Sequence, residues 1–245
     1  MRPTKQIYIN YTAEDILVWK TLFNRQLKNL ENKVSSEFMY SLERIEFNAE
    51  TIPDFMQVNK KLKTLTGWQL VTVPNISEVD EFFKYLAQKK FTSTCWLRSM
   101  QQLDYLEEPD MFHDVFGHTP LLSNKSYALF FEAMGKIAAR HIHQKEIILK
   151  LQRLYWFTIE FGLINENNKI KVFGAGIISS KEETAHATGN SSLKSDFDIE
   201  RIMEHDFRTD VLQNEYYVID SFEQLTECLK QFEKELEEDK RSIVT

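Results

Sequence analysis

The sequence has little cysteine, glycine and proline, with two, seven and five of these residues among 245. Two thiols, Cys95 and Cys228, are too few for a disulfide scaffold, and no stretch rich in Pro, Gly or Ser divides the chain. Long apolar runs are also missing: none reaches the roughly 18 residues that would cross a bilayer, and no apolar signal core follows residues 1–5. We therefore expect one soluble domain in a reducing, cytoplasmic setting.

Positive charge is in deficit. Lys and Arg number 30 against 37 Asp and Glu, which gives a net charge of -7 and a pI near 5.5. The sequence thus offers no basic footprint for nucleic acid or for an anionic membrane surface, and we expect small molecules as partners. A hydrophobic content of 42% at this length is enough to bury one substantial core.

Apolar residues recur mostly at helical spacing, which predicts a predominantly α-helical fold with minor β hairpins. Thr12 with Asp15 and Ser77 with Asp80 have the spacing of capping pairs at helix starts, and Gly67 is a helix stop. The predicted helices are 12–30, 55–65, 77–86, 145–160 and 221–238. The predicted strands are 68–73 and 216–219, with a small hairpin of 163–164 and 170–173. We expect residues 6–11 to be extended.

Two histidines, His113 and His118, lie five residues apart between Pro109 and Pro120. On this local pattern they are either metal ligands or hydrogen-bonded structural residues. In a regular helix, residues five apart point about 140° away from each other, whereas the zinc-protease pair lies four apart on one face. The spacing excludes that enzyme class. A helix that ends or distorts near Gly117 could still bring both imidazoles to one centre.

Glu160 is an acidic residue among apolar and aromatic neighbours, including Trp156 and Phe157. A carboxylate buried there without a partner would cost several kcal/mol or take up a proton. Either a buried salt bridge to Arg98 or Arg153 or a metal shared with the histidines would explain it. Two histidines and one carboxylate are the ligands of non-haem iron sites that keep open positions for oxygen chemistry.

Three sequence blocks, 108–120, 155–162 and 174–180, resemble the signature blocks of the pterin-dependent aromatic amino acid hydroxylases, and the short, single-domain bacterial members most of all. The resemblance runs from about residue 53 to 225, in order and with similar spacing. It implies one catalytic domain over 1–245 with an N-terminal arm of about 1–11, and neither a regulatory domain nor a tetramerisation arm. We therefore expect a monomer.

The resemblance also implies roles for individual residues. His113, His118 and Glu160 would bind Fe(2+). Arg98 would hold the carboxylate of the amino acid substrate, although a surface ion pair is the alternative. The side-chain pocket for the substrate would be formed by Pro109, Trp156, Phe161 and Ser179. The tetrahydropterin would be bound by Phe82, Asp114, Tyr155 and Ile76. A second layer of residues would hold the metal- and ligand-binding side chains in place: Asp110, Ser180 and Glu183. Taken alone, Phe82 and Trp156 could equally be core residues.

The implied reaction is hydroxylation of L-phenylalanine at the para carbon with dioxygen, giving L-tyrosine. Tyrosine or tryptophan hydroxylation by the same parts is an alternative. A zinc hydrolase with Asp114 as base, or a non-catalytic protein that senses pterin or amino acid, are others. Three positions depart from the better-known animal enzymes: Asn75 occupies the position of a glycine, Leu106 that of a threonine and Asp114 that of a glutamate. These changes affect the polar contacts expected for both ligands.

Overall fold

The structure is a computed structural model that describes residues 2–104, 106 and 108–244. Its α-helices are α1 (Ala13–Leu30), α2 (Ser36–Arg44), α3 (Phe55–Leu65), α4 (Val79–Ala87), α5 (Lys125–Arg140), α6 (Lys145–Tyr155), α7 (Ala175–Ser179), α8 (Lys181–Thr188), α9 (Ile199–Glu204) and α10 (Phe222–Val244). Short 3-10 turns are η1 (Tyr8–Asn10), η2 (Met100–Gln102) and η4 (Leu121–Ser123). Two π-helical turns are η3 (Phe112–His118) and η5 (Trp156–Glu160). The expected mostly helical fold is confirmed.

The strands form two small sheets. In one, β1 (Gln69–Thr72) pairs in parallel with β2 (Lys90–Ser93). The other has the order β4-β3-β6-β5, made of β3 (Leu163–Glu166), β4 (Lys169–Val172), β5 (Leu193–Asp196) and β6 (Glu215–Ile219). The predicted hairpin is confirmed: β3 and β4 are antiparallel, and Asn167 and Asn168 have the positive φ angles, 53° and 60°, of a tight turn. Strands β2 and β5 were not predicted.

Helix boundaries follow the sequence signals in most places. Thr12 and Asp15 form a reciprocal capping box at the start of α1. Gly67, with φ of 84°, follows α3 and lets the chain turn into β1. Two expectations were wrong. Helix α4 begins after Glu78 without a side-chain cap, so Ser77 is not its N-cap, and residues 6–11 are not wholly extended, because Tyr8–Asn10 form a 3-10 turn.

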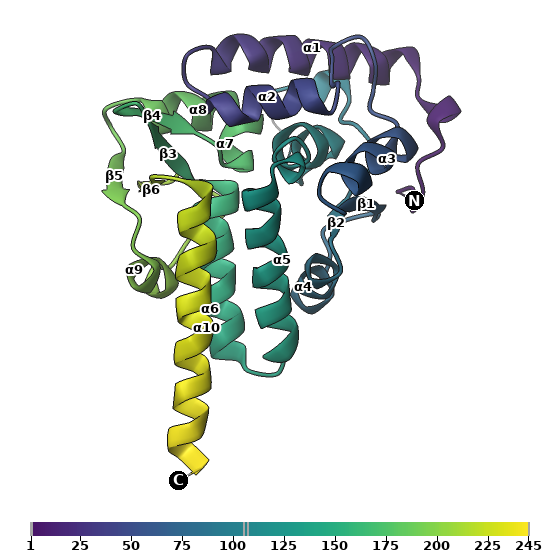
Figure 1. Cartoon of the computed structure of the whole chain (residues 1–245). Helices are drawn as coiled ribbons and strands as arrows, with labels where there is room; N and C mark the ends of the chain where they lie inside the picture. Colours follow the sequence, from purple (N-terminus) through teal and green to yellow (C-terminus); the bar gives the residue numbers. More distant parts are fainter. Residues whose placement is uncertain (1, 105, 107, 245) are drawn as a thin grey trace.

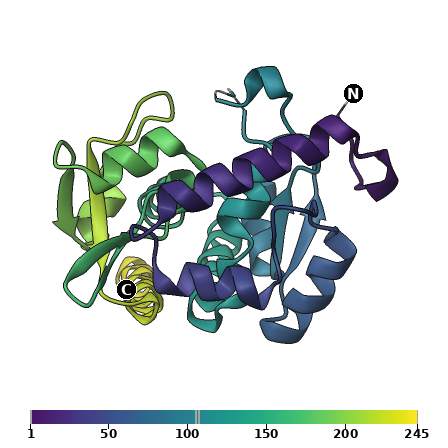
Figure 2. The same cartoon turned by 90° about the horizontal axis from the view of Figure 1, so that it is seen from above.

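The long helices α5, α6 and α10 run side by side, with α1 and α2 lying across one end of them (Figure 1). The four-stranded sheet lies on one side of this bundle, while α3, α4 and the two-stranded sheet lie on the other. Viewed from above, α1 passes over the centre of the molecule (Figure 2). The core beneath it is aromatic: Phe112 stacks on Phe116 at 4.7 Å between ring centroids, and Trp19 and Phe23 pack edge-on against this pair.

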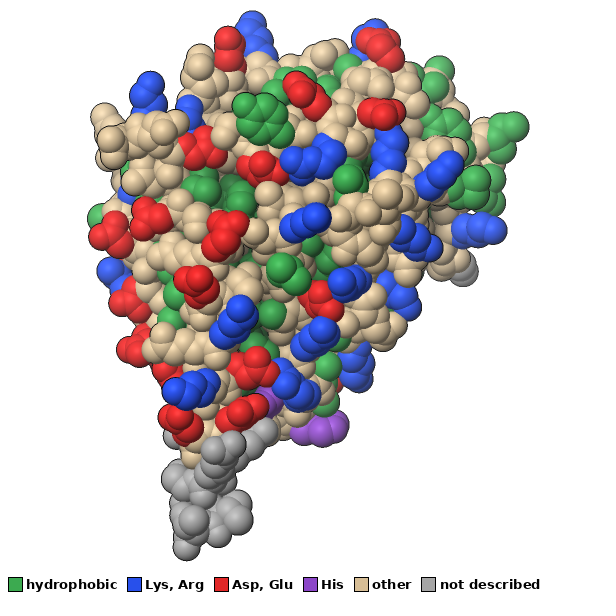
Figure 3. Space-filling view, in the orientation of Figure 1, with side chains coloured by type: hydrophobic (Ala, Val, Ile, Leu, Met, Phe, Trp, Pro, Cys, Tyr) green, Lys and Arg blue, Asp and Glu red, His purple; other side chains and the backbone are tan. Residues whose placement is uncertain are grey.

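On the surface, acidic and basic side chains are interspersed over the face seen in Figure 3. Among the residues that the structure describes, no helix combines the length and apolar character needed to cross a bilayer. The fold places η3 against α1, α7 and β2. His118 of η3 lies beside Tyr155 at the end of α6, with ring centroids 6.4 Å apart, so the predicted site residues of these two segments meet.

Candidate active site

The two histidines meet because the helix that carries them is a π-helix. In η3 the backbone bonds run from i to i+5, so residues five apart lie one above the other. The Nε2 atoms of His113 and His118 are 3.2 Å apart. The predicted distortion near Gly117 is confirmed as this wide turn. A Cβ at Gly117 would lie 3.0 Å from the carbonyl oxygen of Ala175, so glycine lets α7 pack against the turn.

Glu160 arrives from a second π-helical turn, η5, which continues α6. Its Oε1 lies 3.1 Å from Nε2 of His118, and its Oε2 lies 3.6 Å from Nε2 of His113. The salt-bridge alternatives are excluded, because Arg98 pairs with Asp110 and Arg153 pairs with Asp206. The buried carboxylate therefore faces the two imidazoles.

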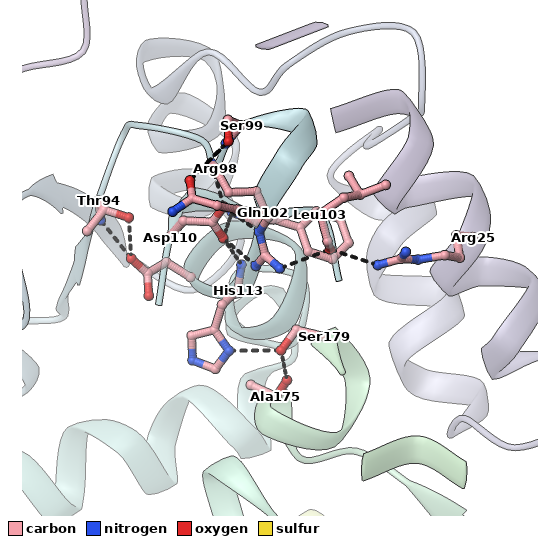
Figure 4. A network of polar contacts seen from close by, with 12 residues as sticks. Arg25, Thr94, Arg98, Ser99, Gln102, Leu103, Asp110, His113, Ala175 and Ser179 are labelled. Atoms are coloured by element: carbon pink, nitrogen blue, oxygen red, sulfur yellow. Dashed lines mark hydrogen bonds and ion pairs between the residues drawn. The ribbon is translucent and has the colours of Figure 1, made fainter. Parts of the chain in front are cut away.

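The protonation states of these groups favour metal binding. The hydroxyl of Ser179 donates to the carbonyl of Ala175 at 2.8 Å, so its oxygen accepts from Nδ1–H of His113, also at 2.8 Å (Figure 4). This leaves the Nε2 lone pair of His113 pointing at the site. Burial lowers the pKa of His113 to about 4. Burial alone would raise the pKa of Glu160, but His118 and His113 lower it to about 2.

The three groups fit a divalent metal. One atom from each of His113, His118 and Glu160 lies within 4.8 Å of the others. Ligand atoms about 2.1 Å from a metal and at right angles to each other are roughly 3 Å apart, close to the separations of 3.1 and 3.2 Å seen here. All three come from one side, which leaves the side facing the cavity open.

A cavity of about 560 Å³ opens above the three ligands. Seven other predicted residues line it: Ile76, Phe82, Pro109, Asp114, Tyr155, Trp156 and Phe161. Phe82 and Tyr155 meet edge-to-face at 5.3 Å. Trp156 lies between Phe161 and Phe207, with centroid distances of 4.6 Å to each. The cavity therefore has aromatic walls and a metal-ligand floor, which suits planar ring ligands.

Asp114 is a second acidic residue of the cavity lining, in addition to Glu160. Its Oδ2 accepts from the backbone N–H and the hydroxyl of Thr94, at 2.7 and 2.9 Å. Burial raises the pKa of Asp114 to about 7, although these hydrogen bonds act in the opposite direction. The carboxyl group is thus poised to exchange a proton near neutral pH.

Several predicted residues lie behind the cavity. Arg98 makes a bidentate pair with Asp110, with both N···O distances at 2.9 Å, and Asp110 is fully buried (Figure 4). Ser180 caps α8 by accepting from the backbone N–H of Glu183. Glu183 accepts from the hydroxyl of Tyr216. The predicted roles of Arg98 and Ser179 toward substrate, and of Ser180 and Glu183 as support, remain predictions.

Other residues at the cavity were not predicted. Phe207 and Thr209 line it from the segment 205–214 between α9 and β6. Asn75, which was expected from the sequence to affect ligand contacts, also lines the cavity, and its Oδ1 accepts from Nη1 of Arg2 at 3.0 Å. The guanidinium of Arg2 stacks over Trp96 at 3.9 Å. Leu106 is partly buried in coil. Aromatic residues within otherwise polar coil, such as Phe207, were the available signal.

Comparison with known proteins gives consistent results. Residues 2–242 match the family described as biopterin-dependent aromatic amino acid hydroxylase. The chain is 47% identical over 218 residues to phenylalanine-4-hydroxylase of Chromobacterium violaceum, covering 88% of this chain and 72% of that protein. It is 41% identical over 221 residues to that of Ralstonia nicotianae, covering 90% and 70%.

A solved structure of the Chromobacterium violaceum phenylalanine hydroxylase with bound iron(III) and oxidized 7,8-dihydrobiopterin is also similar. The TM-score is 0.87 and the identity 44%, with 92% of this chain and 82% of that chain covered. The similarity therefore extends over the whole fold as well as the sequence.

Proposed function

The chain belongs to the biopterin-dependent aromatic amino acid hydroxylase family, and on this premise we propose that it hydroxylates L-phenylalanine at the para carbon to give L-tyrosine. The reaction uses Fe(2+), a tetrahydropterin and dioxygen. The observation that carries this proposal is the convergence of His113, His118 and Glu160 on one side of an aromatic cavity. The bacterial relatives at 41 and 47% identity are phenylalanine-4-hydroxylases, which favours phenylalanine over the other aromatic amino acids.

The protein's own residues supply placement and exclusion of water. Iron and the reduced pterin, when bound, supply the activation of dioxygen. Two aromatic pairs, Phe82 with Tyr155 and Trp156 with Phe161, offer ring faces and edges along the cavity wall. Holding reactants in this way is the source of the proximity effect in catalysis. The aromatic walls keep the reacting centre dry.

Two polar groups complete the assignment. Asp114, with a pKa raised by burial to about 7, acts on the pterin through hydrogen bonding or proton exchange at its carboxyl oxygens. Arg98, held at a fixed orientation by Asp110 through Nε and Nη2, receives the carboxylate of the amino acid with its other N–H groups, on Nη1 and Nη2, of which Nη1 also donates to the carbonyl of Leu103 at 3.5 Å. The enzyme acts as a monomer in the cytoplasm.

The test begins with anaerobic loading of Fe(II), followed by oxygen, a tetrahydropterin and each aromatic amino acid in turn. We expect tyrosine from phenylalanine, no product without pterin, and one iron per chain. Glu160→Ala should lose iron and product while circular dichroism stays unchanged. Glu146→Gln, on the exposed side of the same helix, is the matched control and should behave as wild type.

Each alternative has its own outcome in this assay. Hydroxylation of tryptophan but not phenylalanine would replace the substrate. Retention of zinc with hydrolytic activity and no pterin requirement would refute the hydroxylase proposal, and so would full activity of Glu160→Ala. A single mass of about one chain by light scattering is expected for the monomer.

A further inference from the structure

The segment 205–214, which forms part of the cavity wall, has no regular secondary structure. It connects α9 to β6 and brings Phe207 and Thr209 to the cavity. Among the backbone–backbone hydrogen bonds of the described residues outside helices and strands, none involves residues 206–213. Its shape must therefore be fixed by side chains.

Gln213 does this. The residue is buried, with 6% of its surface exposed, and its Nε2 donates to the carbonyls of Arg208 and Val211 at 3.0 and 3.1 Å. Its Oε1 accepts from Nε1–H of Trp156 at 3.0 Å. Only this amide orientation works, because carbonyls accept and an indole N–H only donates. One side chain thus ties the coil to itself and to the cavity wall.

The backbone of Gln213 is anchored as well. Its N–H donates to Oε1 of Glu183 at 3.2 Å, and its carbonyl accepts from Nε2 of His186 at 3.0 Å. Both partners belong to α8, and the Glu183 carboxylate also accepts from the Tyr216 hydroxyl of β6. Gln213, whose amide group holds Trp156, is therefore bonded directly to α8 and, through Glu183, to β6.

Trp156, which Gln213 holds, is part of an aromatic wall of the cavity. Phe207 stacks on Trp156 at 4.6 Å with an interplanar angle of 18°, and Trp156 packs against Phe161 at the same distance. Trp156 is only partly buried, so packing alone leaves it room to move. The hydrogen bond from its indole fixes the ring about its side-chain torsions.

We propose that Gln213 is a positioning residue for the amino acid substrate: by holding Trp156 and the coil that carries Phe207, it sets the width of the aromatic slot that receives the substrate ring. This inference rests on the proposed function. Gln213 does not line the cavity itself, and it acts through Trp156 and Phe207.

The test is a double-mutant cycle with Gln213→Met and Trp156→Phe. Methionine matches the size of glutamine but has none of its three side-chain hydrogen bonds, and phenylalanine keeps an aromatic ring but lacks the indole N–H. We expect Gln213→Met to raise the KM for phenylalanine about five- to tenfold, the effect of losing one or two hydrogen bonds. The KM for the tetrahydropterin should change less than about twofold, since Phe82 and Tyr155 are untouched.

In the Trp156→Phe background, the further effect of Gln213→Met on this KM should be smaller than in the wild-type background, because the bond to the indole is already lost and only the bonds to the carbonyls of Arg208 and Val211 remain to be removed. Equal effects in both backgrounds would overturn the proposal, and so would an unchanged KM. Gln224→Met is the matched control: Gln224 accepts from the backbone N–H of Asp220 at the start of α10, away from the cavity, and its replacement should leave the KM unchanged.

A spectroscopic readout separates this inference from the proposed function. Subtracting the fluorescence of each Trp156→Phe variant from its Trp156 parent isolates the emission of Trp156. Gln213→Met should move that emission to longer wavelength, as the freed indole meets water, whether or not the protein makes tyrosine. Absence of tyrosine from wild type would refute the function alone, whereas unchanged Trp156 emission would refute the role of Gln213. If Gln213→Met fails to fold, Trp156→Phe alone must still reproduce most of the rise in KM, and a KM unchanged in that variant would refute the proposal.

Discussion

Replacing Ser179 with alanine should weaken metal binding without touching a ligand. The Ser179 hydroxyl oxygen accepts Nδ1–H of His113 at 2.8 Å, which keeps the other ring nitrogen, Nε2, free of a proton. Without that acceptor, the imidazole gains the tautomer with a proton facing the metal and the freedom to rotate. Partners of this kind change metal affinity by about 10- to 100-fold, which corresponds to about 1.4 to 2.7 kcal/mol of binding free energy.

The assay is anaerobic calorimetric titration of the metal-free protein with Fe(II), repeated with Co(II). The neighbouring serine provides the control, since Ser180→Ala removes the N-cap of α8 instead. That variant should lose about 1 kcal/mol of unfolding free energy and keep the wild-type metal affinity. Wild-type affinity in Ser179→Ala, or an equal loss of affinity in Ser180→Ala, would show that the His113 hydrogen bond does not orient the ligand.

Three further predictions concern pH, the cavity rim and packing. Burial raises the pKa of Asp114 in the folded protein to about 7, above the ordinary value of about 4 in the unfolded chain. The free energy of unfolding of the metal-free protein should therefore fall as pH rises from about 4 to 7. Asp114→Asn should gain stability over wild type across that window in urea denaturation with chelator, and parallel profiles would contradict this. Arg2→Ala should raise the tetrahydropterin KM roughly two- to fivefold and leave the phenylalanine KM unchanged, because Arg2 bonds Asn75 on the rim. An Asn75→Gly variant that is insensitive to Arg2→Ala would support this route, and additive effects would exclude it. Gly135→Ala would place a Cβ 2.4 Å from the nitrogen of Ala87, so about 1 to 3 kcal/mol of unfolding free energy should be lost; a stability equal to wild type would refute that contact.

The elements that were predicted correctly from the sequence are those whose boundaries are determined by residues close together in the chain. The capping box at Thr12 and the paired turn residues Asn167 and Asn168 act through bonds and φ angles within a few residues, so their signals are local. The metal ligands were identified partly from the burial of Glu160, which its neighbours also indicate, and partly from resemblance to a family. The local pattern of His113 and His118 could not decide between ligand and structural roles.

The rest depends on contacts between distant parts of the chain. Phe207 reaches Trp156 across 51 positions, and no periodicity in either segment records that meeting. Serine is a common helix N-cap residue, but Ser77 lies two positions before the first helical residue, Val79. Backbone geometry decided that position, and composition alone did not. Strand β5 was missed because its residues, Leu193–Asp196, are half exposed and pair only with β6.

The π-helical turn at Phe112–His118 limits how far the metal site can be transplanted. A twelve-residue segment copied from 109–120 into an ordinary helix would return to i to i+4 bonding and separate its two imidazoles by about 140°. The recipient scaffold would also need a close-packed neighbour equivalent to α7, whose Ala175 lies against Gly117. For protein engineering, the portable unit is therefore the pair of wide turns together with the helix wedged against them, and a linear peptide carrying both histidines should bind iron weakly.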